Sequence, residues 1–322
     1  MPDLTPRRIL FPTDFSTCAE GAFRHAALLA DRFDAALTVL HVVEDASAPT
    51  RAWPDVAGAG TVRITMEDVC HDLRLPLPTD APTVDPHAVI EVEEEEIVGR
   101  DAAEAILDFA TEEEVDLVVM GTHGRRGLER AVVGSVAEAV ARRAPCPVLA
   151  VRPRALRRGI LEAGAATPIV VAVDDPTVDR VPIAARAAAR YALAYGLPLT
   201  FVHVLPIEDP LGHDGTEDAR RHALTGLRAL AETLRTRLEA PLQIHTEVRF
   251  GEPVASVIAL AEATQATLVV VGTHGRRGPG RALLGSVAEA IVRTAPCPVL
   301  IVRDRLAAPP SPVLASRASA AA

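Results

Sequence analysis

A glycine-rich stretch that occurs twice constrains this chain more than any other feature of its sequence. The first copy contains Gly121-Thr122-His123-Gly124 and, after nine further residues, Gly134-Ser135. The second contains Gly272-Thr273-His274-Gly275 and, after the same nine-residue spacing, Gly285-Ser286. The 37 residues around each copy, 116–152 and 267–303, are identical at 27 positions without a gap. In a chain of 322 residues, such a duplication predicts two similar domains.

Each copy lies between a strand-like and a helix-like segment. The apolar runs Leu117–Met120 and Leu268–Val271 come before the glycines, and the helical patterns Val136–Val140 and Val287–Ile291 follow them. A strand, a glycine loop and a helix start, in that order, present unpaired backbone N–H groups to a phosphate. The sequence therefore predicts a phosphate-binding loop in each half.

The rest of the chain alternates strand and helix patterns, which favours two tandem α/β domains with parallel sheets. We place the domains at 1–153 and 168–304, with a linker at 154–167 and a disordered tail at 305–322. Region 44–85 is rich in proline and glycine, and we expect an irregular loop there with a helical piece at 65–73. The expected strands outside the repeat are 8–13, 37–43, 88–94, 148–151, 169–173, 199–204, 243–249 and 299–302, and the expected helices are 17–32, 102–111, 183–195, 217–238 and 254–264.

Composition excludes several classes of protein. The net charge of −10 argues against a general nucleic-acid-binding role. No apolar run approaches the roughly 20 residues that span a bilayer, and the first strand begins too early for a signal peptide, so we expect a cytoplasmic protein. The chain has no lysine, which excludes a Walker A loop. The four cysteines form no C-x-x-C pair and are expected to be small buried thiols.

Acidic residues end the first strand of each half. Asp14 follows one of these strands and Asp174 the other. In an open parallel sheet, ligands bind beyond the carboxyl ends of the strands, where the strand order reverses. If the first and fourth strands are neighbours, each aspartate faces its own glycine loop. A second interpretation of the loop stays open, because Ser135-x-x-Glu138 and Ser286-x-x-Glu289 also fit a capping box.

Taken together, these motifs resemble the universal stress protein family. The resemblance rests on G-x2-G-x9-G-[ST] in both halves, on Pro12-Thr13-Asp14-Phe15-Ser16, on His-Val at 41–42 and 203–204, and on A-P-C-P-V-L-x-V-R at the end of each half. It implies a five-stranded parallel sheet with helices on both faces in each domain, a Rossmann-like fold of the adenine nucleotide alpha hydrolase type. It also implies ATP or AMP as the ligand, with or without Mg²⁺.

The resemblance further implies which residues hold the nucleotide. Asp14 and Val42 would contact adenine in the first half, and Asp174 and Val204 in the second. Gly121 and Gly272 would lie against the ribose. The phosphate contacts would come from the remaining positions, which are Gly124, Gly134, Ser135 and Val136 in the first half and Gly275, Gly285, Ser286 and Val287 in the second. Arg125 and Arg276 follow the second glycine of each loop, where a guanidinium group could contact a phosphate. For these two arginines, a solvated loop position is an equally open interpretation.

Three functions remain open at this point. The first is an ATP-binding stress-response regulator, the second a slow ATPase, and the third an interaction module without nucleotide. We identify no catalytic residue and no metal-ligand set. The resemblance also implies dimerisation through the last strand, which the two halves could satisfy within one chain by pairing Val148–Val151 with Val299–Val302. Whole chains could then associate further as homodimers.

Overall fold

The fold was analysed in a computed structural model of the chain. It describes residues 4–43, 61–72, 85, 87–122, 133–153, 167–176, 181–207, 213–273 and 284–303. We refer to the described residues up to 153 as half one and to those from 167 onward as half two. The predicted tail at 305–322 and nearly all of the predicted linker lie outside the described residues.

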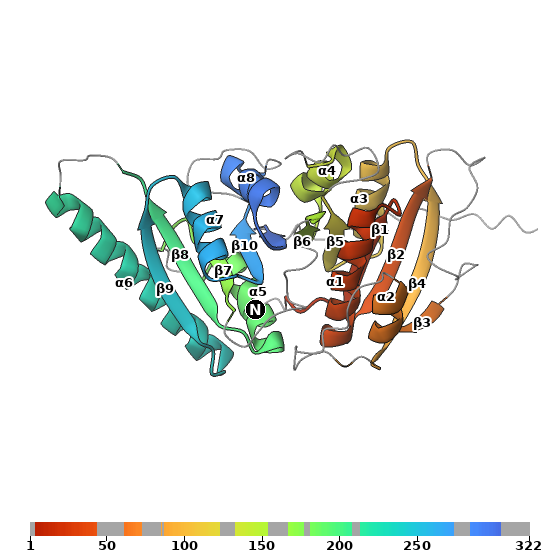
Figure 1. The fold of residues 1–322 in the computed structure, drawn as a ribbon, viewed down its shortest axis with the longest axis horizontal. Helices are drawn as coiled ribbons and strands as arrows, with labels where there is room; N and C mark the ends of the chain where they lie inside the picture. The colour runs from red at the N-terminus through yellow and green to blue at the C-terminus, as the bar shows by residue number, and fades with distance from the viewer. Residues whose placement is uncertain are drawn as a thin grey trace, which may run out of the picture.

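One sheet of eleven strands runs through both halves, in the order β3-β4-β2-β1-β5-β6-β11-β10-β7-β8-β9 (Figure 1). The strands are β1 Arg8–Thr13, β2 Ala36–Val43, β3 Thr61–Thr65, β4 Val89–Val98, β5 Leu117–Gly121, β6 Val148–Val151, β7 Ile169–Ala172, β8 Leu199–Leu205, β9 Ile244–Phe250, β10 Leu268–Gly272 and β11 Val299–Val302. The helices are α1 Thr17–Phe33, α2 Met66–Asp72, α3 Ala102–Glu112, α4 Ser135–Arg143, α5 Ile183–Tyr195, α6 His213–Leu238, α7 Pro253–Ala263 and α8 Ser286–Thr294.

Each half contains five parallel strands in the same order, β4-β2-β1-β5-β6 and β9-β8-β7-β10-β11. Helices cover both faces of this sheet. One buried cluster joins the strands to α1 and α5, and a second joins them to α3, α4, α7 and α8. The central strands β5, β6, β10 and β11 are apolar because both of their faces are covered, whereas β4 and β9 farther out carry charged side chains. The predicted α/β class and the neighbouring first and fourth strands are confirmed.

Half one departs from the expected five-stranded sheet. A sixth strand, β3, pairs antiparallel with β4 in a region that we expected to be irregular apart from its helix. The sequence did not predict Thr61–Thr65 as a strand because the surrounding region is rich in proline and glycine. These five residues can pair because β4 would otherwise be an unpaired edge strand. The expected helical piece is confirmed as α2. Strand β4 also continues through the acidic run Glu93–Glu96 to Val98, because it pairs with β2 along this whole length.

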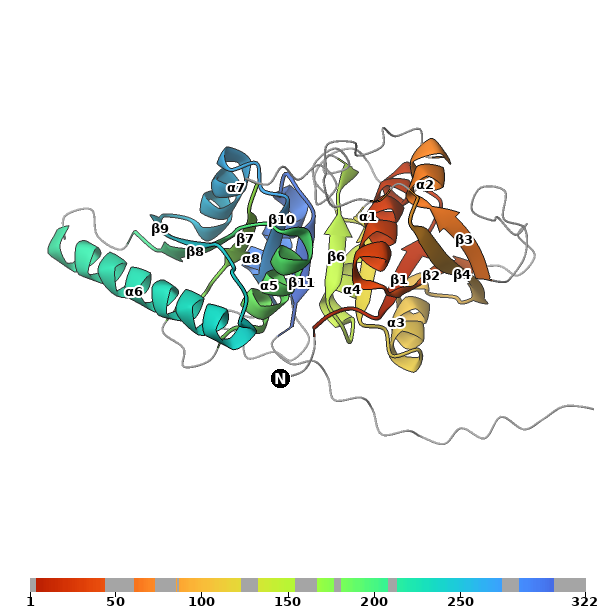
Figure 2. The same cartoon turned by 90° about the horizontal axis from the view of Figure 1, so that it is seen from below.

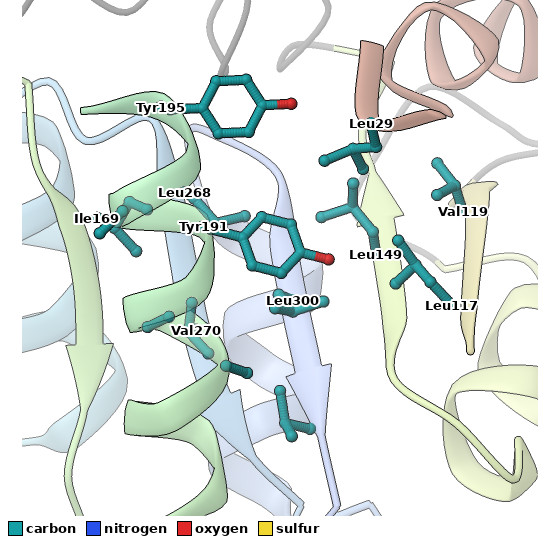
Figure 3. Packing of buried hydrophobic residues seen from close by; sticks show 14 of the residues in the cluster. Leu29, Leu117, Val119, Leu149, Ile169, Tyr191, Tyr195, Leu268, Val270 and Leu300 are labelled. Atoms are coloured by element: carbon teal, nitrogen blue, oxygen red, sulfur yellow. The ribbon is translucent and has the colours of Figure 1, made fainter. Parts of the chain in front are cut away.

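The two halves meet at their last strands, β6 and β11. These strands pair antiparallel, with Leu149 opposite Leu300, so that the sheet continues from one half into the other (Figure 2). Figure 3 shows Leu300 beside Tyr191 of α5, with Leu149 of half one across the junction from them. The Tyr191 ring also packs edge-on against the ring of Phe33 in α1, with centroids 5.3 Å apart. Pairing and packing thus bury the edge that each half would expose alone.

Arginines from half one also contact half two. Arg152 donates a hydrogen bond to the carbonyl oxygen of Ala295 at 2.8 Å. Arg142 in α4 forms ion pairs with Glu138 on its own helix, at 2.6 Å, and with Glu289 of α8, at 3.2 Å. These contacts place α4 beside α8, which are the repeat-related helices that follow the glycine motifs.

Three cysteines, Cys18, Cys146 and Cys297, are buried free thiols, as expected for small packing residues. Burial raises the pKa of the Cys146 thiol to about 12, which keeps it in its unreactive protonated form. Among the described residues, no helix combines the length and the apolar character needed to cross a bilayer.

His25 makes the stability of the chain sensitive to acid. It is buried within α1, and both of its ring nitrogens lack a hydrogen-bond partner among the described residues. Burial, reinforced by the charge of Arg24, lowers the pKa of His25 from 6.5 to about 3. Between these values the unfolded chain binds a proton that the folded chain cannot, so stability falls as the pH drops below 6.5.

We therefore expect the free energy of unfolding to lose about 2 kcal/mol between pH 7 and pH 5 through this one group. Urea unfolding of the wild type and of His25→Ala at both pH values measures the effect, since the variant should lose that share of the pH dependence. His245→Ala removes an exposed histidine and serves as the control. An equal pH dependence in the wild type and His25→Ala would contradict the assignment.

Candidate functional site

The predicted acids and glycines come together at one edge of the sheet. Asp14 directly follows β1, and Gly121 is the last residue of β5. These strands pair in parallel, with Ile9 opposite Leu117, so their carboxyl ends lie side by side. The order of the strands reverses here, because β1 connects to β2 on one side and pairs with β5 on the other. This is the place where open α/β sheets bind ligands.

Half two repeats this arrangement. Gly272 ends β10, which pairs with β7, and Asp174 follows two residues after the last residue of β7. The side chain of Asp174 is exposed, whereas that of Asp14 is half-buried. Each aspartate therefore lies at the carboxyl end of a strand that pairs with the strand leading into its own glycine loop.

A third strand end adjoins each site. Thr13 lies opposite His41 in the pairing of β1 with β2, so Val42 lies one residue beyond, next to Asp14. Val42 and its counterpart Val204 are both half-buried. Each therefore leaves part of its surface accessible beside the predicted acidic residue.

The two histidines at these strand ends have a structural role. The Nδ1 atom of His41 lies 3.0 Å from the carbonyl oxygen of Thr13, and that of His203 lies 2.8 Å from the carbonyl oxygen of Val173. Each ring thus ties the end of one strand to the end of its neighbour.

Backbone hydrogen bonds fix both ends of each glycine loop. In half one, the N–H of Gly134 donates to the carbonyl oxygen of Thr122 at 2.7 Å; in half two, that of Gly285 donates to Thr273 at 3.0 Å. The N–H groups of Thr122 and Thr273 in turn donate to the last strands, at Val151 and Val302. The sequence pattern did not predict a role for the two threonines, although their identity in both copies could have indicated one. They hold the helix start against the end of the sheet.

The capping-box interpretation of the serines is wrong. The residues that cap α4 and α8 are Gly134 and Gly285, both with extended backbone and without a side-chain hydrogen bond to the helix. Ser135 and Ser286 are the first helical residues, one position too late for a capping box. Glycine fits the cap because a Cβ on Gly285 would lie 3.1 Å from the carbonyl oxygen of Thr273.

These two helix starts differ from others in the chain. Helix α1 is capped by Ser16, α3 by the carboxylate of Asp101 and α7 by the carboxylate of Glu252, and each of these side chains accepts backbone N–H groups of its helix. At α4 and α8 the capping glycine offers no such acceptor to the N–H groups of the first turn, which also have no intrahelical one. The first turn of each helix carries a glutamate, Glu138 or Glu289, which offsets part of the positive end of the helix dipole.

The side chains at these helix starts are accessible. Ser135, Ser286 and Val287 are exposed, and Val136 is half-buried. The first turn of each helix thus offers hydroxyl and N–H donors, next to the strand ends that carry the aspartates. Such a group of donors suits a phosphate.

Gly121 allows a close approach between helix and strand. A Cβ there would lie 3.0 Å from the sulfur of Cys18 and 3.1 Å from the carbonyl oxygen of the same residue. A larger residue would push α1 away from the carboxyl end of β5.

Four predicted phosphate contacts, Gly124, Arg125, Gly275 and Arg276, lie outside the described residues.

Two cavities among the described residues lie elsewhere. One of about 560 Å³ lies between α6 and β9, and one of about 110 Å³ lies between α4 and α8. Neither is lined by a predicted site residue. Among the described residues, no group of three or more histidine, cysteine or acidic side chains is placed to hold a metal ion.

Comparison with known proteins identifies a single family. The universal stress protein family model matches residues 5–152 and again 166–303. A universal stress protein of Mycolicibacterium smegmatis is 29% identical over 305 residues, which cover 92% of this chain and 97% of that protein.

Solved structures are similar as well. A universal stress protein from Archaeoglobus fulgidus superposes with a TM-score of 0.60 at 19% identity, covering 93% of this chain and 99% of that one. Another protein from that organism, solved in complex with dAMP, covers 43% of this chain and 99% of its own, at 24% identity and a TM-score of 0.31. With two matches that together span most of its length, the chain belongs to the universal stress protein family and contains two tandem copies of its domain.

Proposed function

We propose that the chain is an adenine-nucleotide-binding regulator of the stress response, with one ATP or AMP site in each half. Its conformation or its choice of partner would depend on whether these sites are occupied. The proposal includes a cytoplasmic location and domain limits at 1–153 and 168–304.

One observation carries the proposal: α4 and α8 both begin with a glycine cap, so no side chain of the cap residue accepts the N–H groups of the first turn. The helices capped by Asp101 and Glu252 have an acidic group in this place, which would repel a phosphate. The same device occurs twice, beside the same strand ends, and family membership independently points to nucleotide. The uncapped amides and the helix dipole suit the charged end of such a ligand.

Within each site, different residues would contact the base, the ribose and the phosphates. The base would lie between Asp14 and Val42 in half one, or between Asp174 and Val204 in half two, and the ribose against Gly121 or Gly272. The phosphates would lie on the helix start and its glycine loop, with Mg²⁺ accompanying them where ATP binds. These contacts come from Gly124, Arg125, Gly134, Ser135 and Val136, and from Gly275, Arg276, Gly285, Ser286 and Val287.

The most direct test is to analyse what the purified protein carries. We expect denatured protein to release adenine nucleotide, identified by chromatography, at up to two molecules per chain. Protein stripped of nucleotide should bind added ATP in calorimetry and gain thermal stability through mass action. Release of phosphate is measured in the same samples, because it separates a binding protein from a slow ATPase. Protein that carries no nucleotide and takes up none would contradict the proposal.

A further inference from the structure

The turn that carries the acidic residue differs between the halves. In half one it runs Thr13-Asp14-Phe15-Ser16, and in half two Val173-Asp174-Asp175-Pro176. These segments follow equivalent strands, because Ile9 of β1 and Ile169 of β7 pair with repeat-related leucines, Leu117 and Leu268. Only the aspartate is shared. At each of the other three positions, half two lacks a group that makes a defined contact in half one.

In half one the turn is fixed by its own hydrogen bonds. The N–H of Phe15 donates to the Thr13 hydroxyl at 3.0 Å, and the N–H of Ser16 donates to Oδ1 of Asp14 at 3.0 Å. The Ser16 hydroxyl then accepts the N–H of Ala19 at 3.2 Å and begins α1. The Asp14 carboxylate is therefore held by the backbone of the turn that it begins.

An aromatic contact completes this turn. The ring of Phe15 packs against the ring of His41, with centroids 4.7 Å apart and a tilt of 56°. Phe15 has a left-handed backbone with φ 56, a conformation that costs a non-glycine residue about 1 kcal/mol and persists only where other contacts fix it. Asp14 precedes one of these rings and Val42 follows the other. The pair of rings thus lies next in sequence to both proposed contacts to the base.

Half two cannot form these contacts. Val173 has no hydroxyl to accept an N–H, and Pro176 has no N–H to donate to Asp174. Asp175 replaces the aromatic ring and adds a second carboxylate next to the first. Its backbone does not share the left-handed φ of Phe15. Helix α5 starts only at Ile183, after Pro182 and without a side-chain cap.

We infer that the two nucleotide sites are unequal: half one is the tight site, and the turn at 13–16 determines its affinity. This inference rests on the proposed function. A turn already fixed in its binding conformation loses less entropy when the ligand binds. The ring pair favours a planar base, whereas the carboxylate that replaces Phe15 in half two, that of Asp175, would have to lose water to pack against that base. The fixed turn, the ring pair and the absence of a second carboxylate all favour tighter binding in half one.

Calorimetry of the full chain with ATP, after removal of bound nucleotide, tests the inference. We expect two classes of site whose dissociation constants differ at least about tenfold. Phe15→Asp should remove the tight class and leave the weak one. The triple change Val173→Thr, Asp175→Phe and Pro176→Ser should convert the weak class into a tighter one, within about threefold of the other. That gain of affinity cannot arise from misfolding.

Two further measurements complete the design. Asp175→Asn removes only the charge, so its affinity separates the electrostatic part of the difference from the part due to the turn. The melting temperature of each variant shows whether it folds. Equal affinities in the wild type, or a tight class that survives Phe15→Asp, would overturn the inference alone. A wild type that binds no ATP would overturn the proposed function and the inference with it.

Discussion

Replacing Ser135 and Ser286 together by aspartate is expected to lower the affinity for ATP at least about hundredfold in both halves. Both serines are exposed first residues of helices, so the new carboxylates would occupy the place proposed for the phosphates. Two unit charges about 4 Å apart repel by about 4 kcal/mol at an effective dielectric constant of 20. This exceeds the roughly 2.7 kcal/mol that a hundredfold change in affinity requires.

The same substitution should leave the fold intact. An acidic side chain in the first turn of a helix interacts favourably with the helix dipole, by about 0.3–1 kcal/mol. Helices α1 and α3 already carry an acidic residue in the first turn, Glu20 and Glu104. We therefore expect the melting temperature without nucleotide to stay constant or to rise. The variant separates loss of binding from loss of structure.

Calorimetry with ATP measures the affinity, and Ser135→Asn with Ser286→Asn is the matched control. Asparagine has the size of aspartate without its charge, so we expect the control to bind within about tenfold of the wild type. Undiminished binding by the aspartate variant would show that the helix starts are not the phosphate sites. Equal losses in both variants would mean that the side-chain volume matters and the charge does not.

Leu300→Asp is expected to destabilise the whole chain by at least about 4 kcal/mol. Leu300 is fully buried in β11, opposite Leu149 of β6, at the point where the two halves join. The change removes apolar contacts and places a carboxylate where the described surroundings are apolar, as Figure 3 shows for the tyrosine rings and Leu149. Because the sheet is continuous, we expect both halves to lose stability.

Chemical unfolding followed by circular dichroism measures this change. Leu300→Met keeps the volume and the apolar character, and its loss should stay below about 1.5 kcal/mol. A loss for Leu300→Asp no larger than that of the methionine variant would mean that the junction is open to water and does not hold the halves together. Two separate transitions in the wild type would also contradict a single cooperative unit.

Local sequence patterns predicted most elements of the fold. The helix at 183–195 agrees at both ends, and α1, which Ser16 caps, begins at residue 17 as expected. These predictions succeed because apolar periodicity and caps are local properties that tertiary packing then satisfies. Strand β3 was missed because its five residues pair only once β4 offers an edge. Such pairing is decided between segments that are distant in sequence.

For the site, the sequence alone was enough to identify the candidate residues, the duplication and the family resemblance. Only the tertiary structure decided that glycine, not serine, caps α4 and α8, since one residue of shift at a helix start depends on the bond from Gly134 to Thr122. Folding also decided that the turn after β1 is fixed by contacts among Thr13, Asp14, Phe15 and Ser16. Sequence lists which donors and acceptors exist, whereas the distances between them, which set their energies, exist only once the chain has folded.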